Sequence, residues 1–96
     1  MQFTIPATHP SLPGHFPGHP VVPGVVVLDR VLDAVEAESG APLATPVRWP
    51  QVKFVQPLLP GEEASIELVR TDGAPRWRFQ VRRGDTLLAS GEVAGS

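Results

Sequence analysis

The chain has 96 residues, which is the size of one small domain, and 42% of them are hydrophobic. It contains no cysteine, which excludes disulfide bonds, a thiolate nucleophile and a zinc–thiolate site. The formal net charge is only −2, so charge alone indicates no nucleic-acid or membrane partner, and no apolar run approaches the roughly twenty residues of a membrane-spanning helix.

The first predicted element is a short strand over residues 2–7, in which Phe3 and Ile5 would point to one side. Residues 8–22 follow as a loop that carries His15. Closely spaced prolines and glycines hold this backbone in a defined irregular path instead of a repeating element. We therefore expect the loop to position its side chains firmly.

A helix is predicted from about Pro23 to Glu38. Proline suits the first turn of a helix because N–H groups there have no intrahelical partner, and Gly40 followed by Pro42 is a stop signal. The apolar residues that share one helical face, predicted to be buried, are Val25, Leu28, Val31, Leu32 and Val35. Asp29 falls at the border of that face, where we expect its carboxylate to be partly desolvated.

Beyond the helix the hydrophobic pattern changes its period from about 3.6 residues to about two, which predicts strands joined by short turns. A strand is expected within residues 46–57, with a change of phase near Pro50 that could be a bulge, and others over 64–69, 76–82 and 86–93. The clearest alternation places Trp77, Phe79 and Val81 on one face and Arg76, Arg78, Gln80 and Arg82 on the other. These elements predict an α+β domain with an antiparallel sheet and a single helix packed on its face.

The chain is similar to a known family in residues 15–29, which read HFPGHPVVPGVVVLD. This stretch resembles the hot-dog-fold 3-hydroxyacyl-acyl carrier protein dehydratases of fatty acid synthesis and their relatives in polyketide-like and aryl polyene pathways. The residues in register with the family are His15, Phe16, Gly18, Pro20, Pro23, Gly24 and Asp29. Residues 53–62, KFVQPLLPGE, also look like the family's strand and its Pro-x-x-Pro-Gly turn. The resemblance implies one hot dog domain over residues 1–96, and the short chain with an aspartate favours the ApeI-like, aryl polyene branch.

The same resemblance implies an enzyme that converts a 3-hydroxyacyl thioester to the trans-2-enoyl product and water. The resemblance implies no cofactor, and it implies a substrate that is carried on the phosphopantetheine arm of acyl carrier protein. His15 would be the base, since an imidazole with a pKa of about 6.5 is mostly neutral near pH 7. Asp29 would be the acid that protonates the leaving hydroxyl group, with apolar neighbours favouring its neutral form. In the family, the histidine of one subunit faces the acid of the other across a dimer interface.

The first turn of the helix is the predicted site for the thioester oxygen, because its backbone N–H groups lack intrahelical acceptors. Gly24 is the expected donor, since a residue without a Cβ lets the thioester approach its amide, and Phe16 and Val25 are expected to contact substrate. One departure from the family is Asp33, which stands where the long-chain enzymes usually have glutamine. Repulsion between Asp29 and Asp33 would keep one of them protonated, or the site would differ in rate or substrate.

Two further features of the sequence each allow more than one interpretation. Arg76, Arg78, Arg82 and Arg83, with Arg70 nearby, are either an ordinary solvated strand face or a docking patch for the acidic acyl carrier protein. Trp77 and Phe79 are either core residues or the lining of an acyl tunnel. Although His9 and His19 could join His15 around a metal ion, the family's loop needs none, so no metal is expected.

The rivals to a dehydratase are a catalytically silent hot dog protein that binds an acyl chain or carrier protein, and a hot dog thioesterase. A chain this short buries a modest fraction of its surface by itself, so we expect a homodimer or a higher assembly of dimers. With no basic n-region and apolar core after Met1, and with no cysteine, we expect a cytoplasmic protein that binds neither nucleic acid nor membrane.

Overall fold

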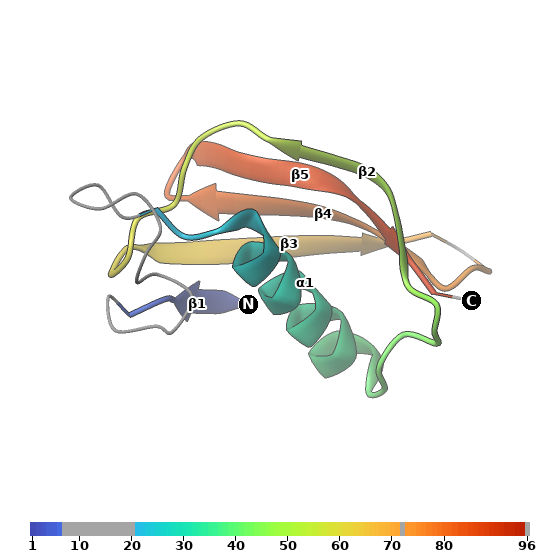
Figure 1. The fold of residues 1–96 in the computed structure, drawn as a ribbon. Helices are drawn as coiled ribbons and strands as arrows, with labels where there is room; N and C mark the ends of the chain where they lie inside the picture. Colours follow the sequence, from blue (N-terminus) through green and yellow to red (C-terminus); the bar gives the residue numbers. More distant parts are fainter. Residues whose placement is uncertain (7–20, 72, 96) are drawn as a thin grey trace.

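The computed structural model of the chain describes residues 1–6, 21–71 and 73–95. In this part of the chain, one helix lies against a five-stranded antiparallel sheet (Figure 1). The elements are β1 (Gln2–Thr4), α1 (Gly24–Ser39), β2 (Arg48–Phe54), β3 (Glu63–Arg70), β4 (Arg76–Arg83) and β5 (Thr86–Ala94). The strand order is β1-β3-β4-β5-β2, so β1 and β2 are the edges of the sheet. Over the described residues, no helix combines the length and apolarity needed to cross a membrane.

The core lies between α1 and the facing side of the sheet. The side chains of Trp77, Phe79 and Val81 on β4 are 5%, 2% and 0% exposed, which confirms the predicted alternation. Phe3 and Ile5 are buried as well, as the first strand predicted. The buried residues of the helix are Val26, Val27, Val31, Ala34 and Val35. Trp77 and Phe79 are therefore core residues.

The helix has the predicted length, but the face that it turns to the sheet differs from the prediction at its first turn. Val25 was expected to be buried and is 65% exposed, whereas Val26 and Val27 are each 5% exposed. Three consecutive valines allow two overlapping apolar faces, and a helical wheel alone does not choose between them. At the other end Gly40, with a φ of 84°, donates its N–H to the Glu36 carbonyl at 2.8 Å.

Irregular pairing shapes the sheet beside the start of the helix. The pairing of β2 with β5 shifts between Arg48 and Gln51, which confirms the bulge predicted near Pro50. A second shift lets β5 carry an extra residue, Leu88, opposite β4. The Leu88 carbonyl accepts hydrogen bonds from the N–H groups of Val55 at 2.8 Å and Gln56 at 3.2 Å. The chain after β2 is thereby held against β5 as it approaches the start of α1.

Candidate active site

An apolar groove of about 400 Å³ lies where α1 begins. It is lined by Val22, Gly24 and Val27 at the helix start, by Phe54, Val55, Gln56, Pro57 and Leu58 after β2, and by Val81, Leu88 and Ala89 of the sheet. A groove of this size with apolar walls can take a small acyl group. A second hollow, of about 430 Å³, lies away from the helix start and is lined partly by Glu67, Arg78 and Glu92. Its charged lining suits an acyl chain less well.

Gly24 allows an unusually close contact within the first groove. A Cβ at this position would lie 2.7 Å from Cζ of Phe54 and 3.1 Å and 3.2 Å from the two neighbouring ring carbons. The ring therefore packs directly on the Gly24 backbone. Among the described residues no acceptor binds the N–H groups of Gly24 or Val25, whereas Val26 donates to the Pro23 carbonyl at 3.0 Å. The first turn therefore has two donors for a ligand oxygen beside an apolar groove.

Asp29 lies one helical turn after Val25, and its side chain is exposed in the single chain. The predicted partial desolvation is therefore not observed in one copy. Asp33 does not act on Asp29 as an uncompensated charge, because Arg30 Nη1 lies 2.9 Å from Asp33 Oδ2. Asp33, Glu36 and Glu38 are all exposed, as expected for a solvated helix face.

His15 and Phe16 lie outside the described residues, as do His9 and His19. The predicted base, the predicted Phe16 contact and the absence of a metal therefore stay predictions. Within residues 1–6, 21–71 and 73–95, no three His, Cys, Asp or Glu side chains gather as metal ligands would.

The arginines on the outer face of β4 differ in their partners among the described residues. Arg76 forms an ion pair with Glu92. Arg82 donates to Gln80 Oε1 at 2.8 Å and lies 3.9 Å from Glu67 Oε1. Arg78 is exposed and has no ion-pair partner among the described residues. The row is thus a surface of mixed charge, in which Arg78 is the cation that no described carboxylate compensates.

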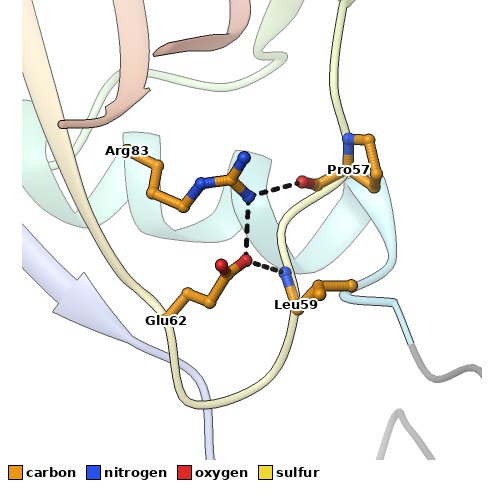
Figure 2. Close-up of polar contacts among 4 residues, drawn as sticks. All are labelled: Pro57, Leu59, Glu62 and Arg83. Carbon is orange, nitrogen blue, oxygen red and sulfur yellow. Dashed lines mark hydrogen bonds and ion pairs between the residues drawn. The ribbon is translucent and has the colours of Figure 1, made fainter. Parts of the chain in front are cut away.

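Arg83 does not belong to this row, although the sequence pattern suggested that it lies with the other arginines. Its Nη1 donates to Glu62 Oε1 at 2.9 Å and to the Pro57 carbonyl at 3.3 Å, as Figure 2 shows. The same Glu62 oxygen accepts the N–H of Leu59 at 2.9 Å. Arg83 therefore holds the turn that forms one wall of the groove. Sequence periodicity could not reveal this role, because the partners lie 21 and 26 residues away along the chain.

Comparison with known proteins matches the chain to a family model and to curated relatives. Residues 1–92 match a family model described as "ApeI-like: ApeI dehydratase". The 3-hydroxyacyl-[acyl-carrier-protein] dehydratase FabZ of Magnetococcus marinus is 34% identical over 94 residues, which cover 88% of this chain and 59% of the relative. The enzyme of that name from Thermus thermophilus is 39% identical over 84 residues, which cover 88% of this chain and 48% of the relative. The chain thus spans 59% and 48% of the lengths of these two relatives.

Solved structures agree on the fold. The dehydratase heterocomplex ApeI:P from Xenorhabdus doucetiae has a TM-score of 0.76 at 24% identity, over 97% of this chain and 81% of that one. A variant of the fluoroacetyl-CoA-specific thioesterase FlK has a TM-score of 0.65 at 18% identity, over 98% of this chain and 85% of that one. At these identities the likeness concerns the fold alone. It confirms the predicted hot dog fold, in which an antiparallel sheet wraps one helix.

Proposed function

The chain belongs to the ApeI-like dehydratase family, and from this we propose that it removes water from 3-hydroxyacyl groups carried on acyl carrier protein. The product would be the trans-2-enoyl thioester, in aryl polyene, fatty acid or polyketide-like synthesis. The observation that carries the proposal is the family match over residues 1–92. The apolar groove beside the Gly24 amide supports it, because this is where a thioester would have to lie.

The reaction breaks a C–H bond beside the thioester carbonyl and a C–O bond on the next carbon. In our proposal His15 takes the proton from the α-carbon, and Asp29 gives a proton to the departing hydroxyl group, which leaves as water. The electron pair of the C–H bond becomes the new double bond. Negative charge grows on the thioester oxygen as this occurs, and the Gly24 N–H would stabilise it.

We propose further that His15 and Asp29 come from different copies in a dimer. Asp29 and Val25 are exposed on one side of α1, and Phe54, Val55 and Leu59 are 53%, 44% and 43% exposed. The strand β2 that ends at Phe54 is an edge of the sheet, whose outer backbone groups lack a strand partner among the described residues. A second copy over this region would remove water from around the Asp29 carboxyl group and bury apolar surface.

The experiment that tests the function is incubation of the protein with a 3-hydroxyacyl-acyl carrier protein, followed by mass spectrometry of the carrier. Loss of water is the expected result. An unchanged carrier would indicate a silent binding protein, and release of free hydroxy acid would indicate a thioesterase. His15→Ala and Asp29→Asn should each lower the rate by about 100-fold or more. Turnover at the wild-type rate in either variant would refute the assignment.

Docking of the carrier protein gives a separate prediction. Among the described residues, Arg78 is the cation of the β4 row that has no ion pair to break before it can bind an acidic partner. Arg78→Glu should lower kcat/KM for the carrier-bound substrate about 10-fold at low salt, because opposite charge speeds encounter. A small pantetheine thioester should be turned over as before. Equal loss on both substrates would show that Arg78 acts on the fold and not on docking.

A further inference from the structure

The turn over residues 57–62 forms part of the wall of the groove, and few of its own N–H groups are available to hold it in place. Pro57 and Pro60 have no N–H, so the turn has fewer donors with which to bond neighbouring strands. Two backbone bonds tie it to its neighbours, from the Gly61 N–H to the Ile5 carbonyl at 2.9 Å and from the Val22 N–H to the Leu58 carbonyl at 2.8 Å. Within the turn, the Glu62 N–H donates to the Leu59 carbonyl at 3.2 Å. Charged side chains add further support among the described residues.

Glu62, at the end of the turn, and Arg83, at the end of β4, form the side-chain bonds that hold the turn (Figure 2). Arg83 reaches from the end of β4 to the Pro57 carbonyl at 3.3 Å and to Glu62 Oε1 at 2.9 Å. Glu62 Oε1 also accepts the N–H of Leu59 at 2.9 Å. The two charged side chains are only 34% and 32% exposed, which shields the pair from solvent more than a surface pair.

The turn is in direct contact with the segment that leads into the helix. Leu58 is 3% exposed, and its carbonyl accepts the N–H of Val22 at 2.8 Å. Val22 is followed by Pro23, which precedes the first residue of α1, Gly24. A shift of the turn would therefore be passed through one hydrogen bond and a stiff proline to the amide proposed to bind the thioester oxygen.

We propose that Glu62 and Arg83 are positioning residues, which set where the Gly24 amide stands relative to the thioester carbonyl. This inference rests on the proposed function and adds two residues to its site. Neither residue lines the groove, so neither would touch a substrate that binds there. Their effect is on geometry, and misplacement of a catalytic group by about 1 Å can cost about 100-fold in rate.

The kinetic test uses Glu62→Gln, Arg83→Met and the double variant in the full chain. The substrate is a small 3-hydroxyacyl pantetheine thioester, so that carrier docking plays no part. Each single variant should lower kcat about 10-fold with KM within about 2-fold of wild type, and the double variant should be no worse than the worse single one, because the pair acts as a unit. Arg83→Lys, which keeps the positive charge on a shorter side chain without the planar guanidinium, should fall between wild type and Arg83→Met.

Matched controls come from residues of the same type outside the network. Glu63 is the exposed neighbour of Glu62, and Arg48 is exposed at the start of β2. Glu63→Gln and Arg48→Met should keep the wild-type kcat. If Arg83→Met does not fold, which thermal unfolding will show, Glu62→Gln and Arg83→Lys decide the question because the first keeps size and polarity and the second keeps the positive charge.

A second readout separates positioning from a purely structural role. In 15N–1H NMR spectra, the amide signals of Val22 and Gly24 should move in Glu62→Gln and stay in place in Glu63→Gln. A kcat of Glu62→Gln equal to wild type, or an unmoved Gly24 signal, would overturn the inference. If instead the wild-type protein removes no water, the proposed function fails, while the NMR comparison still tests the coupling of Glu62 to Gly24.

Discussion

At the scale of single residues, the effect of adding a methyl group to a glycine depends on whether the atoms next to that glycine can move. The nearest neighbour of Gly24 is the ring of Phe54, which is 53% exposed and can rotate away. The nearest neighbour of Gly91 is the backbone carbonyl oxygen of Gln51, which would lie 2.1 Å from an added Cβ and cannot give way without moving β2. The same added methyl group should therefore act on function at one glycine and on folding at the other.

Gly24→Ala tests the first of these expectations. The methyl group would stand between the substrate and the first-turn amides, so kcat/KM for a small 3-hydroxyacyl thioester should fall about 10-fold or more. Because the Phe54 ring can turn into solvent, the free energy of unfolding should change by less than about 1 kcal/mol. Steady-state kinetics and denaturant unfolding measure the two quantities. Wild-type kinetics in this variant would remove Gly24 from the site.

The residue scale also shows what a sequence can say about the site. Gly24 was predicted from its place in the motif, and the groove lies against it. Asp29 was expected to be partly desolvated and is exposed, because the described part of one copy places no apolar cover over it. Glu62 was missed altogether, since its role depends on Arg83, 21 residues further along the chain.

At the scale of elements, the close pairing of β2 with β5 depends on Gly91. Phe79 pairs with Gly91 across the sheet, and the bulge in β2 brings the Gln51 carbonyl to the same place. Gly91→Ala forces the two backbones apart, so it should lower the free energy of unfolding by about 3 kcal/mol. Chemical denaturation measures this loss. A variant as stable as wild type would mean that β2 adjusts freely at its bulge.

Most elements followed from local pattern, and the exceptions have physical causes. The helix, its glycine cap and the inward residues of β4 were predicted because periodicity and capping are local properties. The prediction that Val25 is buried was wrong, because the run of valines offers two apolar faces and packing on the sheet selects one of them. The local pattern also could not predict the partners of Arg83, because only tertiary folding brings the 57–62 turn to the end of β4.

At the scale of the whole molecule, the exposed apolar residues near the helix start predict self-association. Val25 is 65% exposed there, and Val69, on β3, is 64% exposed and serves as its control. Burial of a valine side chain contributes about 1.5 kcal/mol, so Val25→Asp should weaken a dimer by about 10-fold or more. An aspartate in the first turn suits the helix dipole, so the single chain should still fold.

Sedimentation velocity over a range of concentrations measures the effect. The sedimentation coefficients of wild type and Val69→Asp should correspond to a dimer. The Val25→Asp variant should already be dissociated at concentrations at which both of these are still dimers. Equal dissociation of the two aspartate variants would place the interface elsewhere.

The central claim is that His15 of one copy works with Asp29 of the other, and mixing two inactive variants tests it most directly. His15→Ala and Asp29→Asn are combined under conditions that exchange subunits, and water loss from a 3-hydroxyacyl thioester is measured. Half of the dimers should be mixed, each with one intact site, so activity should return to about one quarter of the wild-type value. If the subunits exchange and the mixture stays as inactive as its parts, the two residues do not share a site across copies.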